Sequence, residues 1–228
     1  MKNLVIAIPA IFDTANRQAL ELIRQINGTF QVPIIVLTDR PDMYEQFGNV
    51  QTIHYTKPVF SYHDKRTLLE EGFKQHDSVL VMDSDHLMTR RNMTELLTFD
   101  AAALNPGIYP RTAFSFWMQR FAEGHSSVYY WEEYLAFCKE ESFKVEGSIF
   151  IQESLFLVKR HDRIEEFLAI WAKIQILCDT IDAAHGKKVL GHAEGCAIAI
   201  AANSTELPVV ELHPMMESVR PCFLHAKL

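Results

Sequence analysis

The chain has 228 residues, of which 48% are hydrophobic and 22% charged, and its formal net charge is −7. This length suits one α/β domain with a full core. The negative charge excludes a global electrostatic attraction to nucleic acid or to an anionic membrane surface, although a local basic groove stays possible. No apolar run is long enough to span a membrane, so no transmembrane segment is expected.

The four cysteines lie among apolar neighbours, and none belongs to a C-x-x-C pair. Free, buried thiols in a reducing compartment are the simplest interpretation of this pattern. We therefore expect a cytoplasmic protein.

Strands and helices alternate in the first half of the chain. Apolar strands are predicted at 3–8, 33–38, 50–55 and 79–82. Amphipathic helices are predicted from Asp13 or Thr14 to Asn27 and over 64–76. This order, with fully apolar strands, favours an α/β fold with a doubly wound, mainly parallel sheet and helices on both faces.

The second half is less regular. A strand is predicted near 108–116, one or two strands over 147–158, and helices over 127–138, 161–178 and 193–203. Nothing in the sequence resembles a linker between domains, so residues 1–228 are predicted to form a single domain.

Two carboxylates follow the apolar strand Val79–Met82, in the triplet Asp83-Ser84-Asp85. A buried strand does not need them, whereas a hard divalent cation does, because carboxylate oxygens suit Mg²⁺ or Mn²⁺. Such an ion can join a protein to the phosphates of a nucleotide. The alternative is an acidic turn that stops the strand and stays solvated, since the bare Asp-x-Asp pattern is common by chance.

Other candidates lie where strands end, because doubly wound sheets bind ligands outside the carboxyl ends of their strands. Pro9 follows the first strand. Asp39 follows the second, where it can bind a base or ribose, or cap the turn after it. Lys65 and Arg66 open a helix, where cations oppose the helix dipole; they are either phosphate ligands or solvated surface charges.

Three later residues have both a functional and a structural interpretation. Glu194 is either a catalytic carboxylate or a favourable first-turn residue of its helix. Glu153 interrupts an apolar stretch, either in a hairpin turn or facing a pocket. His225 either completes a metal site built on two carboxylates or is simply exposed near the end of the sequence.

The glycine-rich loops of dinucleotide oxidoreductases and P-loop enzymes are missing, because neither G-x-G-x-x-G nor G-x-x-x-x-G-K-[ST] occurs. Both classes are therefore disfavoured. A metal would have to bind the phosphates that those backbone amides normally bind, which strengthens the metal interpretation of Asp83 and Asp85.

These features together resemble the GT-A class of nucleotide-sugar glycosyltransferases. The similarity is carried by the first strand, Asp39, the helix with Lys65 and Arg66, the Asp83 triplet, and His225-Ala226-Lys227. The chain looks closest to the retaining glycogenin-like and lipopolysaccharide-galactosyltransferase-like branch. The resemblance implies a GT-A fold, with a nucleotide-binding half over about 1–100 and an acceptor-side half over about 101–228.

The resemblance also implies roles for single residues. Asp83 and Asp85 would bind Mn²⁺ (or Mg²⁺), His225 would complete the metal site, and Lys227 would contact the pyrophosphate. The remaining predicted contacts to the donor come from Pro9, Asp39, Lys65, Arg66 and Ser84, with Asp39 at the uridine. Glu194 and Glu153 are the catalytic candidates.

The predicted function is metal-dependent transfer of a sugar from a nucleotide donor, in the first place a UDP-sugar, to an acceptor hydroxyl. The acceptor is open: a saccharide, or a hydroxymethylated DNA base. Two alternatives remain, a nucleotidyltransferase and a non-catalytic nucleotide-sugar-binding protein. The basic residues that would form a face for DNA are Arg90, Arg91, Arg111, Arg120, Lys187 and Lys188.

Overall fold

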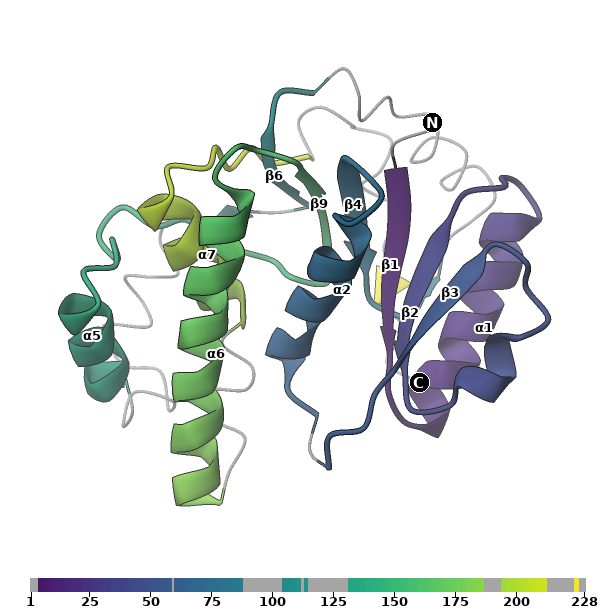
Figure 1. The fold of residues 1–228 in the computed structure, drawn as a ribbon, viewed down its shortest axis with the longest axis horizontal. Coiled ribbons are helices and arrows are strands. Elements are labelled where there is room, and N and C mark those ends of the chain that lie inside the picture. The colour runs from purple at the N-terminus through teal and green to yellow at the C-terminus, as the bar shows by residue number, and fades with distance from the viewer. Residues whose placement is uncertain are drawn as a thin grey trace.

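A six-stranded sheet forms the centre of the protein (Figure 1). The computed structural model describes residues 4–58, 60–87, 104–111, 113–114, 131–186, 194–212 and 224–225. The strands of the central sheet are β1 (Leu4–Ala10), β2 (Ile34–Thr38), β3 (Val50–His54), β4 (Ser78–Met82), β6 (Gly107–Pro110) and β9 (Leu155–Lys159).

The strands follow the order β3-β2-β1-β4-β9-β6, and β1 to β4 are parallel to their neighbours in this set. β9 runs antiparallel to both β4 and β6. Both halves of the sequence therefore contribute strands to one sheet. Two short antiparallel pairs lie outside it: β5 (His86–Leu87) with β10 (Leu224–His225), and β7 (Ala113–Phe114) with β8 (Phe150–Ile151).

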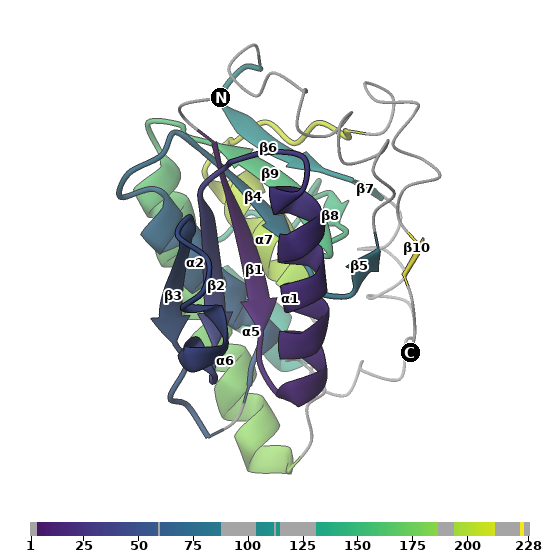
Figure 2. The same ribbon diagram turned by 90° about the vertical axis from the view of Figure 1, so that its right-hand side faces the viewer.

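Helices cover both faces of the sheet (Figures 1 and 2). One face packs against α1, and the other against α2, α6 and α7, as two separate clusters of buried apolar side chains show. Two short 3₁₀ turns, Pro41–Tyr44 and Tyr62–Asp64, connect elements. The helices are α1 (Asp13–Asn27), α2 (Lys65–Gly72), α5 (Trp131–Glu140), α6 (Ile164–His185) and α7 (Glu194–Ser204).

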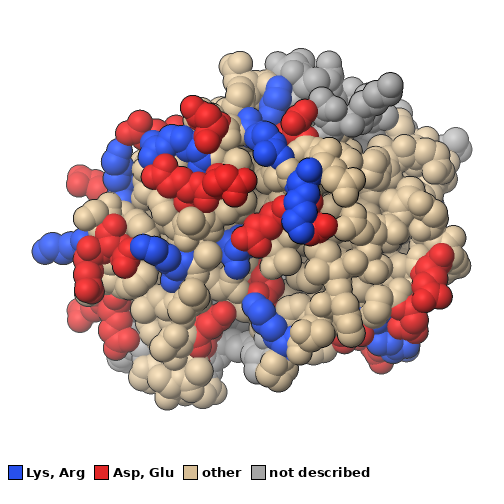
Figure 3. Space-filling model, in the orientation of Figure 1, with Lys and Arg blue, Asp and Glu red and all other residues tan. Residues whose placement is uncertain are grey.

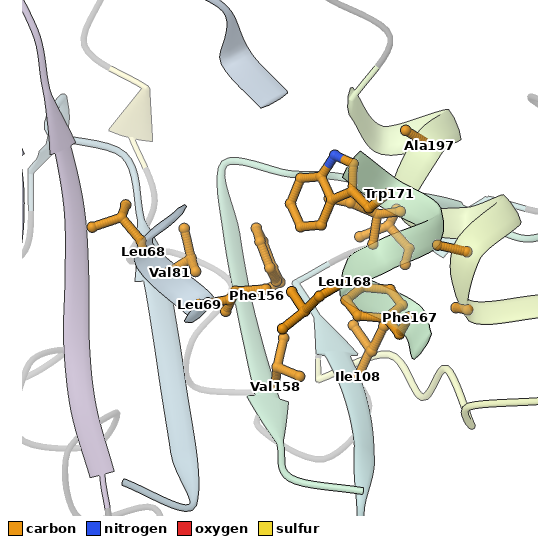
Figure 4. Close-up of a cluster of buried hydrophobic side chains, with 14 of the residues drawn as sticks. Leu68, Leu69, Val81, Ile108, Phe156, Val158, Phe167, Leu168, Trp171 and Ala197 are labelled. Carbon is orange, nitrogen blue, oxygen red and sulfur yellow. The ribbon is translucent and has the colours of Figure 1, made fainter. Parts of the chain in front are cut away.

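The larger apolar cluster joins the two halves of the chain (Figure 4). Side chains of α2 and β4 meet those of β9 and α6 there, with Phe156 and Trp171 fully buried near its centre. The indole N–H of Trp171 donates a hydrogen bond to Nδ1 of His63 at 3.1 Å, which satisfies two buried polar groups at once. Burial of this cluster fixes α2, and with it the residues at its start, against the second half.

The predicted doubly wound sheet is confirmed, with differences at the ends of elements. β1 continues through Pro9 to Ala10, because its pairing with β4 ends at Ala7 and a residue without an N–H is tolerated where only one neighbour is paired. α2 stops at Gly72, earlier than expected. α6 extends to His185, beyond its expected end, until Gly186 supplies a left-handed cap with φ of 62°.

Gly72 allows α2 to lie directly on the sheet. A Cβ added there would stand 2.6 Å from Cγ2 of Val79. In an open helix, Gly→Ala stabilises by about 0.4–1 kcal/mol, but overpacking costs about 1–3 kcal/mol. We expect Gly72→Ala to lower the free energy of unfolding in urea, while Gly48→Ala, where nothing lies within 4 Å, leaves it near the wild-type value. A more stable Gly72→Ala variant would contradict this packing.

Candidate active site

The candidate site is a pocket at the point where the sheet grows in opposite directions. β2 and β3 lie on one side of β1 and β4 on the other, so the carboxyl ends of β1 and β4 flank a crevice of the kind that binds ligands in such sheets. The cavity there has a volume of about 200 Å³. Its lining comprises Pro9, Ile11, Phe12, Ala15, Gln18, Phe60, Tyr62, Lys65, Asp83, Ser84 and Asp85.

Asp83, Ser84 and Asp85 form a tight turn between β4 and β5. The backbone N–H of Asp83 donates to the carbonyl oxygen of Ser154 at 2.9 Å, and that of His86 to the carbonyl oxygen of Asp83 at 3.3 Å. Nδ1 of His86 also lies 3.0 Å from the Asp83 carbonyl oxygen. A carbonyl only accepts, so this nitrogen carries the proton. The turn thus holds both carboxylates at the pocket, each about a quarter exposed.

Lys65 is buried among oxygens from three parts of the chain. Its Nζ lies 2.7 Å from Oδ1 of Asp83, 2.7 Å from Oε1 of Glu194 and 3.2 Å from the carbonyl oxygen of Glu153. Burial opposes the charge of the ammonium, but Asp83 and Glu194 outweigh burial and raise the pKa of Lys65. An ammonium has three N–H donors. The phosphate contact predicted for Lys65 therefore stays a prediction that requires one of these bonds to be exchanged.

Glu194 is the first residue of α7, and its side chain is 1% exposed. Burial, followed by the nearby charges of Glu153 and Asp83, raises its pKa to about 8 even though Lys65 lowers it. The lack of a side chain at Gly195 allows the start of α7 to pack this closely against β8, because a Cβ there would stand 2.3 Å from the carbonyl oxygen of Ile151. Glu153 itself is only partly buried and lies in the turn before β9. The two predicted catalytic carboxylates thus lie near each other but differ in access to solvent.

Asp39 does not line the pocket, but it holds Phe12, a residue that does. Its Oδ1 accepts hydrogen bonds from the backbone N–H of Phe12 at 3.1 Å and from Nδ2 of Asn16 at 2.8 Å. The turn that Asp39 was expected to cap is held instead by Thr38, whose Oγ1 accepts from the N–H of Arg40 at 2.9 Å. The predicted contact of Asp39 with a base or ribose stays a prediction.

Arg66 points away from the pocket, toward α6. Its Nε donates to Oε1 of Gln175 at 3.2 Å, and its Nη1 pairs with Glu70. The amide of Gln175 in turn donates to the buried Asp64 at 2.7 Å. Arg66 therefore belongs to a network that ties the start of α2 to α6, and the phosphate contact predicted for it stays a prediction.

The metal site predicted from Asp83, Asp85 and His225 lies only partly within the described residues. In this part of the chain, no three His, Cys, Asp or Glu side chains converge to hold a metal ion. For His225 only the backbone is described; it pairs with His86, one residue after Asp85 (Figure 2). This pairing brings the backbone of the third predicted ligand beside the turn. Lys227 lies outside the described residues.

Aromatic and neutral polar residues of the pocket were missed from the sequence. The rings of Phe12 and Tyr62 pack edge-to-face on Phe60, with centroids 6.4 and 5.2 Å away. Burial, and then Glu194, raise the pKa of Tyr62, so its hydroxyl stays protonated. Gln18, which lines the pocket, and His86, which supports the Asp83 turn from outside the lining, were also missed. Phe12 lies two residues after the end of β1, and His86 directly follows the Asp83 triplet; this position near strand ends is the signal that could have found them.

Surface charge gives little support to a basic face. On the face shown in Figure 3, Lys and Arg side chains are interspersed with Asp and Glu. Arg111 is described and partly buried, whereas the other five residues of the predicted DNA-binding face lie outside the described residues.

Two further predictions concern membrane spans and cysteines. No helix in the described ranges is long and apolar enough to cross a membrane. The described cysteines Cys138, Cys178 and Cys196 are free and buried.

Comparison with known proteins identifies the fold. Neither a protein-family model nor a curated protein matches the sequence. Among solved structures, the galactosyltransferase LgtC, determined in complex with donor and acceptor sugar analogues, aligns with 91% of this chain and 72% of its own, with a TM-score of 0.51 and 14% identity. The chain has the GT-A fold. The predicted resemblance to GT-A enzymes is thereby confirmed at the level of the fold.

Two further GT-A structures align less closely. The glycosyltransferase GlyE of Streptococcus pneumoniae TIGR4 aligns with 94% of this chain and 46% of its own, with a TM-score of 0.45 and 13% identity. The bifunctional glycosyltransferase WbbM, in its apo structure, aligns with 76% of this chain and 34% of its own, with a TM-score of 0.46 and 15% identity. The chain thus spans less than half the length of either protein.

The raised pKa of Glu194 predicts a pH-dependent stability. Its folded pKa of about 8 exceeds the ordinary value of 4.5, so the stabilisation is complete below 4.5 and is lost as pH rises through about 8. Glu194→Gln cannot titrate. We expect the free energy of unfolding of the wild type, relative to this variant, to fall between these pH values in urea titrations. Parallel pH profiles for the two proteins would rule out a buried, titrating Glu194.

The burial of Lys65 predicts a large effect on stability. Lys65→Met leaves Asp83 and Glu194 without their cation, and breaking a buried pair costs about 3–5 kcal/mol. Lys74→Met, an exposed control near the end of the same helix, removes only a surface pair worth about 0–1 kcal/mol. We expect urea denaturation to separate the two variants clearly. Adding Glu194→Gln should recover part of the loss, and a loss no larger than that of the control would argue against the buried pair.

Proposed function

We propose that this protein is a metal-dependent glycosyltransferase that moves a sugar from a nucleotide donor, in the first place a UDP-sugar, to an acceptor hydroxyl. One observation carries the proposal: Asp83 and Asp85 line the same pocket as an aromatic wall formed by Phe12 and Phe60, at the switch point of a GT-A fold. The two ends of a nucleoside diphosphate fit these two parts of the pocket. The flat base can stack on the aromatic wall, and the charged diphosphate can bind a metal held by the carboxylates.

The charges of the pocket support a requirement for a cation. Asp83 and Asp85 line the pocket together with one described ammonium, that of Lys65, whose three donors already face oxygens. An anionic diphosphate would be repelled there unless a further positive charge were present. A divalent ion held by Asp83 and Asp85, with His225 as the proposed third ligand, would supply this charge and neutralise the leaving diphosphate.

The aromatic end of the pocket suits the base of the donor. Phe12 is 58% exposed and lines the pocket beside Phe60. Stacking on such a ring tolerates any base, so selectivity for uridine has to come from polar groups. Asp39 is the proposed uridine contact, because its Oδ1 already fixes the Phe12 amide and its carboxylate lies at the same end of the sheet.

The two glutamates receive different roles. In the reaction the bond between the anomeric carbon and the diphosphate oxygen breaks, the acceptor oxygen bonds to that carbon, and the hydroxyl proton passes to a base. Glu153 is partly exposed and is the better candidate to face the acceptor. Glu194 is buried against Lys65, so we assign it to fixing Lys65, and through it Asp83, rather than to contact with the acceptor.

The decisive experiment mixes the protein with UDP-sugars and Mn²⁺ and analyses the products. Release of UDP, with transfer to a saccharide or to hydroxymethylated DNA, supports the glycosyltransferase. Pyrophosphate from a nucleoside triphosphate and a sugar phosphate would instead indicate a nucleotidyltransferase, and binding without turnover a non-catalytic protein. A panel of nucleotide sugars in thermal shift, with and without Mn²⁺, identifies the donor first, because a ligand of the folded state raises its apparent stability.

Removing one carboxylate should abolish transfer without unfolding the chain. We expect Asp85→Ala to lower the rate of sugar transfer by at least about 100-fold, the order found when one electrostatic contact to a transition state is lost. Asp77→Asn, just before the start of β4 and paired with Arg160, is the matched control and should keep wild-type activity. Full activity of Asp85→Ala, or of the wild type in excess chelator, would refute the mechanism.

A further inference from the structure

Phe12 has an unusual backbone conformation for its residue type. Its φ is 76° and its ψ 158°, although it is not a glycine. A bulky residue in this region is strained, and such strain persists where the surroundings over-determine it and is often found at functional sites. The ring of Phe12 is exposed and lines the pocket beside Phe60 and Asp83.

Both peptide groups of Phe12 are held by hydrogen bonds. Its N–H donates to Oδ1 of Asp39 at 3.1 Å. Its carbonyl oxygen accepts from the backbone N–H of Asn16 at 3.0 Å and from Nδ2 of Asn16 at 3.0 Å. The two dihedral angles of Phe12 lie between these groups, so the bonds fix the direction in which its ring leaves the backbone.

Asn16 is the centre of this arrangement, and it is fully buried. Its Nδ2 donates to Phe12 and, at 2.8 Å, to Asp39, while its Oδ1 accepts from Oγ1 of Thr38 at 2.6 Å and from the hydroxyl of Tyr44 at 2.8 Å. Both donors and both acceptor sites of the amide are therefore used. Because no part of Asn16 is accessible, it cannot touch a ligand and acts only through its neighbours.

We propose that Asn16 is a positioning residue for the nucleotide donor: it holds Phe12 in the strained conformation that presents its ring to the base. The proposal rests on the proposed function, since the base of a nucleotide is the group that the ring would meet. It assigns Asp39 a second task, that of fixing the amide of Phe12 from the end of β2. Loss of Asn16 releases the ring and lowers donor affinity without changing a group that touches the reacting atoms.

A purely structural role for the same network is the competing explanation, and the chain contains a matched control for it. At the other end of α1, Asn27 and Asn49 exchange hydrogen bonds at 3.1 and 2.8 Å, and Asn49 also donates to the carbonyl oxygen of Val32 at 2.7 Å. This pair likewise ties α1 to the edge of the sheet, but none of its members lines the pocket.

The test measures UDP binding in the presence of Mn²⁺, and donor KM and kcat, for Asn16→Ala, Asn27→Ala, Phe12→Ala and the double variant Phe12→Ala/Asn16→Ala. We expect Asn16→Ala and Phe12→Ala each to weaken binding by about tenfold, the order expected for the loss of one stacked ring. KM rises with kcat nearly unchanged, and Asn27→Ala binds as the wild type does. The double variant binds no worse than Phe12→Ala, because Asn16 acts through Phe12.

Additive losses in the double variant, or equal losses in Asn16→Ala and Asn27→Ala, would overturn the proposal. Amide hydrogen exchange on the free protein separates this failure from a failure of the proposed function. Asn16→Ala should speed exchange at Phe12 and its neighbours while the middle of α1 stays protected. If the wild type binds no UDP, the proposed function falls; the positioning role falls independently if exchange at Phe12 is unchanged.

Discussion

The buried ammonium of Lys65 is the interaction on which the arrangement of the site depends. A charge in a low-dielectric interior is tolerated only with polar groups or opposite charges in contact, and Asp83 and Glu194 supply these contacts to Lys65 at 2.7 Å each. These groups come from α2, the turn after β4 and the start of α7. The carbonyl oxygen of Glu153, before β9, completes the set. Both halves of the chain thus contribute oxygen atoms that contact the same atom, Nζ of Lys65.

This arrangement leaves the pocket with more negative than positive charge. Lys65 is committed to the protein, and Arg66, its neighbour in sequence, is committed to Gln175 and Glu70. The described part of the pocket therefore offers carboxylates to a metal and aromatic rings to a base, but no spare cation to a phosphate. The proposed recognition of a nucleotide through a divalent ion rests on this distribution more directly than on the Asp-x-Asp pattern alone.

Much of the fold could be predicted from the sequence, because apolar runs and helical stripes follow local periodicity. The position of Asp83 at the end of a buried strand likewise predicted an end of the sheet where the structure has a pocket. The partners could not be predicted. Lys65 meets Glu194 across 129 residues, and this contact depends on how closely Gly195 approaches β8. Lys65 and Arg66 looked equivalent, yet successive helical residues point about 100° apart, so only one faces the pocket.

The reversed direction of β9 has a consequence for how this site can diversify. In a parallel strand, residues at the carboxyl end face the ligand, but β9 presents its beginning there, since Ser154 bonds to Asp83 while Arg160, just beyond the far end of β9, bonds to Asp77. Residues added before Leu155 would enter the pocket, whereas those added after Lys159 would emerge at the opposite edge. The length of the Gln152–Ser154 turn can therefore change the space beside Asp83 while the pairing of β9 with β4 stays in register.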